Sequence, residues 1–256
     1  MIVKKHIVRF LTKVRKGRKI VEDKVFIAVN LLSQKETAKK PRRTEIINYF
    51  VSLTDQKYYL EIGVRDPRKN FLRINCENKF SVDPGVEFIE NPVDFKMTSD
   101  DFFRKINDNK IEKLIDKKFD VIFIDGLHIS NQVEKDIQNS LKLIKEDGFI
   151  ILHDCNPPSE YHQREDYEFV NSPAGPFWNG TTWKAFYKFR YESELYSICF
   201  DSDWGVGVIS KRKLPLFNNL ERPIKNEFYE FKFLNDNRTD SLNLHLFEVW
   251  KQKIKK

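Results

Sequence analysis

Two short apolar runs flank an amphipathic segment in the middle of the chain, within residues 119–158. The first run, 121–124, stops at Asp125, and the second run, 149–152, is followed within two residues by Asp154. Between the runs, apolar residues recur at spacings of three and four, which is the period of a helix that packs on one side. The pattern predicts a βαβ unit whose two strands are parallel and buried.

The carboxyl ends of neighbouring parallel strands lie at the same edge of a sheet, and open α/β sheets bind ligands at that edge. Four polar side chains follow the two predicted strands: Asp125, His128, His153 and Asp154. We expect these four side chains to lie together and to carry the chemistry of the protein. Gly148 is expected to close the helix between the two strands.

Strands and helices continue to alternate on both sides of this unit. Further strands are expected at residues 58–63, 79–83, 93–97, 195–200 and 205–209. Further helices are expected from residues 44, 71, 99, 182 and 242, with Thr44 as the cap of the first and Ser99 or Asp100 as the cap of the third. The last two strands are expected to form an antiparallel hairpin. The polar stretch from 159 to about 180 has the length of a lid or binding loop.

Charge is distributed unevenly along the 256 residues. The formal net charge is +7, and much of the excess lies near the N-terminus. We expect a basic helical extension over residues 1–43, a main domain over 44–212 and a helical extension over 213–256. Two roles stay open for the first extension: an amphipathic helix resting on an anionic membrane or a partner, or a helix packed on the domain with a solvated basic side. Residues 39–43 are expected to be a linker.

The three cysteines, Cys76, Cys155 and Cys199, are widely spaced and fit neither a disulfide framework nor a zinc site. A reducing compartment is therefore expected, and the absence of a long apolar run favours a soluble, cytoplasmic protein, with membrane association through the basic extension left open. No nucleic-acid partner is expected because no recognised nucleic-acid motif is present. Homo-oligomer formation is left open.

An acidic residue ends the second predicted strand, about twenty residues after the sequence Glu61-Ile62-Gly63. Asp83 at this position could accept hydrogen bonds from both hydroxyls of a ribose, or it could simply begin the turn before Pro84. The loop 64–70 contains no further glycine, so its backbone is poorly suited to a pyrophosphate. This argues against NAD or FAD and favours an adenosyl cofactor without a pyrophosphate.

The chain resembles the class I S-adenosylmethionine-dependent methyltransferases. More narrowly, it resembles the bacterial macrocin O-methyltransferase-like enzymes, a branch associated with sugar or surface-polysaccharide modification. The resemblance covers roughly residues 55–210 and rests on six segments: YYLEIGVRDP at 58–67, SVDPG at 81–85, FDVIFIDGLH at 119–128, GFIILHDCNPP at 148–158, WNGTTWKAF at 178–186 and WGVGVIS at 204–210. It implies an α/β, Rossmann-like fold: a seven-stranded, mostly parallel sheet that ends in an antiparallel hairpin, with helices on both faces.

The resemblance also implies S-adenosylmethionine as the cofactor. Glu61 and Gly63 would line its methionine end, Asp83 its ribose, and Ser99 and Asp100 its adenine. The implied cofactor-binding residues are Glu61, Gly63, Val64, Arg65, Asp83, Ser99, Asp100, Asp125 and Gly126. The usual glycine-rich first loop is replaced by residues 65–68, RDPR, so side chains would have to supply contacts there.

A sugar hydroxyl is a poor nucleophile, so a base or a metal ion should help to remove its proton. His128 is the first candidate for the base, and its alternative role is to brace the helix that follows. By resemblance to related sugar methyltransferases, Asp125 and Asp154 match the carboxylates that hold Mg²⁺. The flanking residues His153 and Cys155 stand where the related pattern has a second acid, so metal dependence is a hypothesis.

Trp178 and Asn179 follow the long polar stretch and are candidate acceptor-binding residues, because indole rings stack on sugars and amides bind hydroxyls. The alternative is that the aromatic residues anchor a loop, which is expected of Trp183. The predicted function is methyl transfer from S-adenosylmethionine to a hydroxyl of a sugar or surface-glycan precursor. The alternatives are another small-molecule or lipid-linked acceptor, a basic nucleic-acid-binding module, or a catalytically silent adenosyl-binding scaffold.

Overall fold

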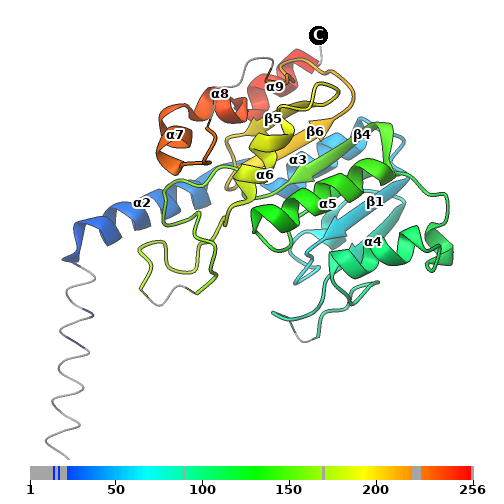
Figure 1. The fold of residues 1–256 in the computed structure, drawn as a ribbon, viewed down its shortest axis with the longest axis horizontal. Helices are drawn as coiled ribbons and strands as arrows, with labels where there is room; N and C mark the ends of the chain where they lie inside the picture. Colours follow the sequence, from blue (N-terminus) through cyan, green and yellow to red (C-terminus); the bar gives the residue numbers. More distant parts are fainter. Residues whose placement is uncertain are drawn as a thin grey trace, which may run out of the picture.

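A seven-stranded mixed sheet runs through the protein in the order β2-β1-β3-β4-β6-β5-β7 (Figure 1). The computed structural model describes residues 14, 17, 22–88, 90–168, 171–220 and 226–254. The strands are β1 (Tyr58–Ile62), β2 (Asn78–Val82), β3 (Phe119–Ile124), β4 (Ile144–Leu152), β5 (Tyr196–Phe200), β6 (Val206–Ser210) and β7 (Leu244–His245). Strands β2, β1, β3 and β4 are parallel, whereas β6 is antiparallel to both β4 and β5.

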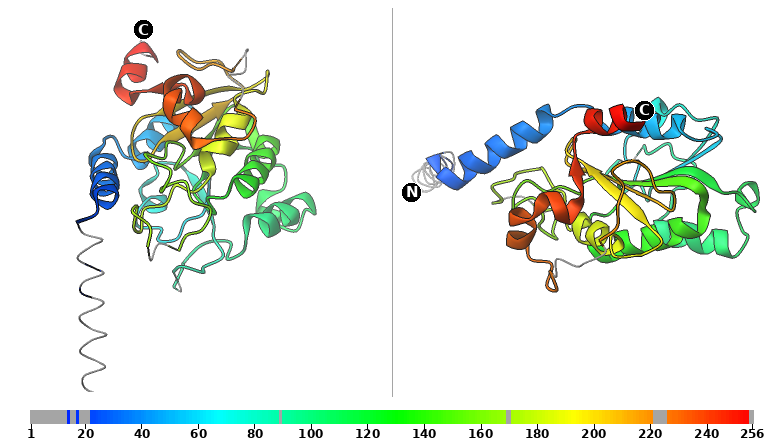
Figure 2. Two further views of the ribbon diagram at one scale, coloured as in Figure 1. Left: turned by 60° about the vertical axis from the view of Figure 1, so that its left-hand side comes forward. Right: turned by 90° about the horizontal axis from the view of Figure 1, so that it is seen from above.

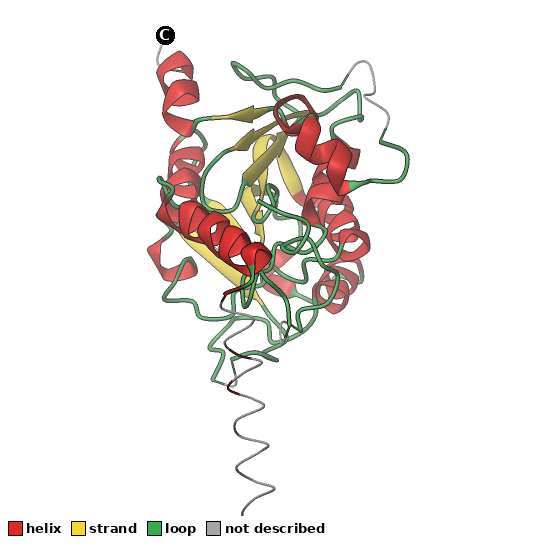
Figure 3. Cartoon of the chain, turned by 90° about the vertical axis from the view of Figure 1, so that its left-hand side faces the viewer, coloured by secondary structure: helices red, strands yellow, loops and turns green. Residues whose placement is uncertain are grey.

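Helices cover both faces of this sheet (Figures 2 and 3). They are α2 (Lys24–Ala38), α3 (Arg43–Ser52), α4 (Ser99–Asn107), α5 (Ser130–Leu143), α6 (Thr182–Phe189), α7 (Phe231–Asp236), α8 (Arg238–Leu242) and α9 (Phe247–Ile254). The side chains of α4 to α8 form one buried apolar cluster with the sheet, and those of α3 and α9 form another. The predicted Rossmann-like fold with a terminal antiparallel hairpin is confirmed.

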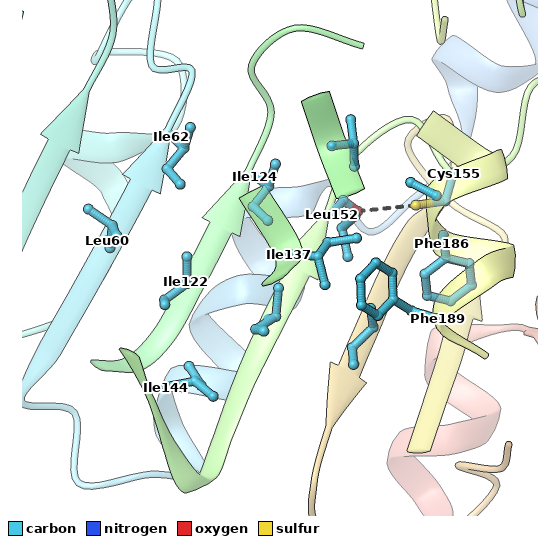
Figure 4. Packing of buried hydrophobic residues seen from close by; sticks show 14 of the residues in the cluster. Leu60, Ile62, Ile122, Ile124, Ile137, Ile144, Leu152, Cys155, Phe186 and Phe189 are labelled. Carbon is cyan, nitrogen blue, oxygen red and sulfur yellow. Dashed lines mark hydrogen bonds between the residues drawn. The ribbon is translucent and has the colours of Figure 1, made fainter. Parts of the chain in front are cut away.

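The central strand β3 shows why the sequence takes this layered form. All six of its residues are buried, and successive side chains point to opposite faces of the sheet. Ile122 and Ile124 pack with Ile137 of α5 on one face (Figure 4), whereas Val121 and Phe123 belong to the cluster on the other face. A continuous apolar run is therefore what a doubly covered parallel strand requires.

The edge of the sheet differs from the prediction. Residues 93–97 do not form a strand; they contribute one isolated bridge, between Val82 and Phe95. The reason is that the side chain of Asp94 accepts hydrogen bonds from the backbone amide of Ser81, at 2.9 Å, and from its hydroxyl, at 2.7 Å. A side chain thus replaces part of the ladder. The seventh strand is instead β7, in the C-terminal part of the chain.

The expected role of Gly148 is also wrong. The helix ends at Leu143, β4 begins at Ile144, and Gly148 lies within that strand. The β3–β4 pairing shifts register between Phe119 and Val121, opposite this segment. A Cβ atom at Gly148 would lie 2.9 Å from the carbonyl oxygen of Asp120, so the glycine permits close approach of the two strands at the irregularity.

Three expected helices differ from the prediction, one in its length and two in the residue that precedes their first turn. The helix expected from residue 71 is a single 3₁₀ turn, Phe71–Arg73, because the ammonium group of Lys79 binds carbonyl oxygens that a longer helix would use. The N-cap of α4 is Thr98, one residue earlier than expected, and its hydroxyl accepts a hydrogen bond from the amide of Asp101. Helix α3 begins at Arg43, so Thr44 lies inside its first turn and is not the cap.

The helix expected from residue 242 begins only at Phe247, since residues 244–245 pair with β5. Of the basic helical extension expected over residues 1–43, the first 21 residues lie outside the described residues, except for residues 14 and 17. Helix α2 projects away from the sheet (Figure 1). Among the helices of the described ranges, none combines the length and the apolar character needed to cross a bilayer.

The expected linker at residues 39–43 is fixed to the β5–β6 turn by ion pairs. The ammonium group of Lys39 lies 2.6 Å from Asp201, and the guanidinium group of Arg42 lies 2.7 Å from Asp203. The backbone amide of Arg43 also donates to Asp203, at 2.8 Å. This segment is therefore part of the folded structure beside the carboxyl ends of the strands.

Candidate functional site at the carboxyl ends of the strands

The register of three parallel strands brings their following residues together. Ile62 of β1 pairs with Ile124 of β3, which pairs with Leu152 of β4. At the end of β1, Gly63 has a φ of +84°, and a Cβ atom there would lie 2.3 Å from the carbonyl oxygen of Asp125. Glycine is thus needed at this position both for the left-handed backbone and for close contact with the loop after β3.

The four side chains expected at this edge are in contact with one another. His128 Nε2 lies 3.4 Å from an oxygen of Asp125, and His128 Nδ1 lies 3.5 Å from an oxygen of Asp154. His153 Nδ1 lies 2.9 Å from Asp154 and 3.2 Å from Asp125. The expectation that these four residues gather at one edge is confirmed, and we call them the rim cluster.

Two further charged residues, which the sequence patterns did not indicate, lie against the inner side of the rim cluster. Arg43 Nη1 lies 3.2 Å from His153 Nε2, and Arg43 Nε lies 3.6 Å from Asp125. Asp203, in the β5–β6 turn, lies 3.7 Å from His153 Nε2 and also binds Arg43. Arg43 belongs to a basic run and Asp203 to a hairpin turn, so neither position carries a signal of its own in the sequence.

Neighbouring charges decide the ionisation of the rim cluster. Burial opposes ionisation of Asp125, but His153 and Arg43 outweigh it and hold the pKa of this carboxyl well below its usual value. Burial also opposes the charged form of both histidines, yet Asp154 and Asp125 raise the pKa of His128 and raise that of His153 well above its usual value. The carboxyl group of Asp125 and the two imidazoles are therefore held in opposite charge states.

The hydrogen-bonding surroundings of His128 explain the direction of its pKa shift. Its Nδ1 lies 3.1 Å from the carbonyl oxygen of Trp178, and its Nε2 faces the carboxylate of Asp125. Because both ring nitrogens face acceptors, the doubly protonated ring is favoured over either neutral tautomer. His128 keeps 17% of its side-chain surface exposed, whereas His153 keeps 6%. His128 is thus the more accessible of the two to a substrate.

The rim cluster also contains a set of atoms that could hold a metal ion. Asp125, His128 and Asp154 each offer one ligand atom, and these atoms all lie within 4.8 Å of one another. Two carboxylate oxygens suit Mg²⁺ or Mn²⁺, and an imidazole nitrogen is a common third ligand for transition metals. The backbone of Asp154 has a φ of 61°, an uncommon conformation for a residue other than glycine. The donor set therefore fits a divalent cation.

The segment after the long loop braces the rim cluster. Asn179 is buried, and its amide nitrogen donates to Asp154, at 2.9 Å, and to the carbonyl oxygen of Trp204, at 3.1 Å. The ring of Trp178 stacks on His128 with centroids 5.0 Å apart. At Gly180, a Cβ atom would lie 1.9 Å from the carbonyl oxygen of His128. The two candidate acceptor residues thus contact the cluster directly.

The long polar stretch has no helix or strand in its described part, as predicted, but it is held by specific contacts. The guanidinium group of Arg164 donates to the carbonyl oxygens of Tyr161, Gly175 and Phe177. The expected anchoring role of Trp183 is confirmed, since its side chain is fully buried and its indole N–H donates to Gln163 at 2.8 Å.

We call the residues expected to bind the cofactor outside the rim the cofactor end: Glu61, Gly63, Val64, Arg65, Asp83, Ser99 and Asp100. The acidic side chains of the cofactor end accept hydrogen bonds from neighbouring residues of the protein. Glu61 is buried and accepts hydrogen bonds from the hydroxyl of Tyr59, at 2.6 Å, and from the amide of Asn70, at 2.9 Å. Burial raises the pKa of Glu61 to about 8, despite these hydrogen bonds. The Glu61 side chain is therefore mostly protonated at neutral pH.

Asp83 holds two loops together. Its carboxylate accepts hydrogen bonds from the backbone amides of Arg65, at 2.9 Å, and Gly85, at 2.6 Å, and from the side chain of Asn91, at 2.5 Å. The side chain of Arg65 is exposed and lies 3.4 Å from Glu87, while Val64 packs into the core. Asp83 thus organises the turn, and a ribose hydroxyl would have to share its oxygens with these donors.

The residues expected near an adenine ring connect two helices. The side-chain amide of Gln132, on α5, donates to Ser99 at 3.2 Å and to Asp100 at 2.9 Å, both in the first turn of α4. Nearby, burial raises the pKa of Asp136 to about 6. Gly126 lies against Gly63, between the cofactor end and the rim cluster.

Residues 61–155 match a family model described as a methyltransferase domain. This range contains the whole cofactor end and all four residues of the rim cluster. It supports the methyltransferase part of the resemblance, while the sugar-modifying branch stays a prediction. No curated protein is detectably similar in sequence.

Several solved structures resemble the chain at low identity. An O-methyltransferase from Bacillus cereus, crystallised with SAH, is 15% identical, with 73% of this chain and 91% of that chain covered and a TM-score of 0.43. The Podospora anserina methyltransferase PaMTH1 is 14% identical, with 79% and 96% covered and a TM-score of 0.45. The MycE methyltransferase, crystallised with Mg, SAH and mycinamycin VI, is 13% identical, with 77% and 57% covered and a TM-score of 0.43. Likenesses at this level leave cofactor and acceptor to be argued from the site itself.

Proposed function

We propose that this protein transfers a methyl group from S-adenosylmethionine to a hydroxyl of a small acceptor, a sugar or glycan precursor. The proposal is supported by the methyltransferase domain at residues 61–155. The observation that carries it is the position of His128, a partly exposed imidazole between two carboxylates at the edge where α/β sheets bind ligands.

When bound, S-adenosylmethionine would supply a methyl group activated by its sulfonium, and transfer of this group to the acceptor oxygen would release S-adenosylhomocysteine, a neutral thioether. The proton of the acceptor hydroxyl passes to Nε2 of His128, which must therefore be neutral when the acceptor binds. Nδ1–H remains directed at the carbonyl oxygen of Trp178. The nearby carboxylate of Asp125 then stabilises the imidazolium ion that forms.

His153 and Asp154 have a positioning role in this mechanism. His153 is enclosed by Asp154, Asp125, Asp203 and Arg43, so it is well placed to fix the carboxylates and poorly placed to meet a substrate. Asn179 fixes the other oxygen of Asp154. Trp178 forms a wall over His128, where an indole ring can contact an apolar sugar face.

A divalent cation is part of the proposal as an alternative means of activating the acceptor. Asp125 and Asp154 would hold it, with Nε2 of His128 as a further ligand. When bound, such an ion would lower the pKa of the acceptor hydroxyl by attracting its oxygen. Its presence would also change the task of His128 from base to ligand, so metal dependence and the role of His128 have to be tested together.

For the cofactor, we propose that the methionine end lies along Glu61, Gly63, Val64 and Arg65, and that the sulfonium group lies beside Asp125 and Gly126. Asp83 would bind the ribose, and Ser99 and Asp100 would lie near the adenine. The short loop between β1 and the 3₁₀ turn supports this placement, because Asp83 already orients the backbone of Arg65.

Calorimetric titration with S-adenosylhomocysteine tests the proposed function. Wild type should bind in the micromolar range, and Asp83→Asn should weaken binding by tenfold or more, about 1.4 kcal/mol. Asp101→Asn is the matched control, because Asp101 is an acid in the same part of the chain whose carboxylate pairs with Arg104 on the surface. No binding by folded wild-type protein, with or without Mg²⁺, would rule the proposal out. Binding should then be followed by a screen of sugars and nucleotide-sugars as acceptors.

A further inference from the structure

A basic pocket lies beside the rim cluster. It is lined by Arg42, Arg43, Thr44, Lys69, Arg73 and Asp203. These residues come from the start of α3, from the loop after β1 with its 3₁₀ turn, and from the β5–β6 turn. The pocket therefore opens at the same edge of the sheet as the rim cluster, and it carries more cationic than acidic side chains.

The cations of this region are not equally paired. Arg65 lies 3.4 Å from Glu87, and Arg68 lies 2.9 Å from Asp66, so these two guanidinium groups have acidic partners. By contrast, the side chains of Lys69 and Arg73 form neither a hydrogen bond nor an ion pair within the described part of the chain, and both are exposed. The loop thus directs its unpaired cations to the pocket.

Arg43 connects the pocket to the rim cluster. Its Nη1 contacts His153 and Asp203, while its Nε is buried and has no hydrogen-bond partner, at 3.6 Å from Asp125. A guanidinium group with an unused donor at the boundary of two sites can serve a ligand that reaches from one to the other. A ligand in the pocket would therefore be adjacent to the reacting atoms of the proposed mechanism.

Like charges within one hollow repel each other, and the only acid in the lining, Asp203, is already bound by Arg42 and Arg43. An anion placed among these side chains would remove that repulsion. Arginine forks are suited to two oxygens of a phosphate or carboxylate, and a lysine adds a point charge.

We propose that this pocket binds an anionic oxygen group, a phosphate or a carboxylate, of a molecule that reacts at the rim cluster. The inference deepens the proposed function, because its role in turnover depends on methyl transfer. Two sources share this chemistry: the carboxylate of the cofactor's methionine part, and a phosphate or carboxylate carried by the acceptor, as in a sugar phosphate.

The test compares three proteins by calorimetry at low ionic strength: wild type, the pocket variant Lys69→Ala/Arg73→Ala, and the control variant Arg212→Ala/Lys213→Ala. The control removes two exposed cations that follow β6, which is antiparallel to β4, so they lie at the opposite edge of the sheet. Inorganic phosphate should bind wild type and control alike and bind the pocket variant about tenfold more weakly or worse. Equal phosphate affinity in all three folded proteins, or none in any, would overturn the proposal.

A second pair of titrations identifies the source. S-adenosylhomocysteine carries the carboxylate, whereas 5′-methylthioadenosine lacks the amino-acid part. If the pocket variant loses affinity for the first but not the second, the pocket serves the cofactor. If it keeps both affinities and loses phosphate alone, the anion belongs to the acceptor. If wild type binds neither nucleoside, the methyltransferase proposal fails, while the phosphate titration still decides whether the pocket is an anion site.

Discussion

The rim cluster and the cofactor end occupy the same edge of one sheet, yet their charges are balanced in different ways. At the rim, acids face histidines and Arg43, so charge is balanced between side chains. At the cofactor end, Asp83 is satisfied by backbone amides and an asparagine, and Glu61 by a tyrosine and an asparagine. The rim therefore has the ionisable pairs that the proposed proton transfer needs, whereas the acids of the cofactor end are occupied by hydrogen bonds within the protein.

The strongest test of this comparison is removal of the proposed base. His128→Ala should lower turnover about 10²- to 10⁴-fold, the usual contribution of a positioned general base. Affinity for S-adenosylhomocysteine should stay unchanged, because His128 belongs to the rim. Steady-state kinetics measures the turnover, and calorimetry measures the affinity for S-adenosylhomocysteine. His128→Gln shows whether a neutral side chain of similar polarity restores any turnover. Full activity in either variant would eliminate the base assignment.

The inner charges of the rim should matter for stability. Asp203 is buried and holds Arg42, Arg43 and, at 3.7 Å, His153. Asp203→Ala leaves these cations without their acid, which should lower the free energy of unfolding by about 3 kcal/mol. Urea denaturation measures the change. Asp201→Ala is the control, because Asp201 lies in the same turn but is more exposed and should cost clearly less. Equal losses of unfolding free energy in the two variants would mean that the buried ion pairs of Asp203 with Arg42 and Arg43 are not what stabilises this turn.

Much of the rim could be predicted from sequence because it depends on local signals. The ends of β3 and β4 are marked by apolar runs followed by polar residues, and parallel pairing fixes their relative position. Arg43 and Asp203 could not be found in this way, since their contacts join segments about 160 residues apart and their own surroundings in the chain look like a basic linker and a turn. Likewise, residues 93–97 do not form the expected strand, because the side chain of Asp94 accepts the hydrogen bond from the backbone amide of Ser81 that a neighbouring strand would otherwise accept.

The pH dependence of catalysis should report the charge balance of the rim. The pKa of His128 is raised by Asp154 and Asp125 against the effect of burial. A base must be neutral to accept a proton, so kcat/KM should increase with pH and level off above the raised pKa, higher than the ordinary value of about 6.5. Asp154→Asn should shift this rise to lower pH. A profile that is flat across neutral pH would contradict a proton-accepting role for His128.

The smallest effect is expected at the cofactor end, from Glu61→Gln at acidic pH. The pKa of Glu61 is about 8 in the folded protein against a value of 4.5 when unperturbed, so the folded state binds a proton that the unfolded state releases. Stability contributed by this group is therefore present below pH 4.5 and declines as the pH rises towards 8. Below pH 4.5 the carboxyl group is protonated in both the folded and the unfolded state, so the acid and the amide are nearly equivalent there, and the free energies of unfolding should agree within about 1 kcal/mol.

Denaturation as a function of pH distinguishes a protonated Glu61 from an ordinary ionised glutamate. Wild type should lose stability relative to Glu61→Gln as the pH rises from 4.5 to 8, because only the wild type has a carboxyl group to ionise. Glu45→Gln is the control, since Glu45 is an exposed acid at the start of α3. If the difference instead grew as the pH fell, Glu61 would be an ionised ligand-binding group, and the cofactor end would balance charge in the same way as the rim.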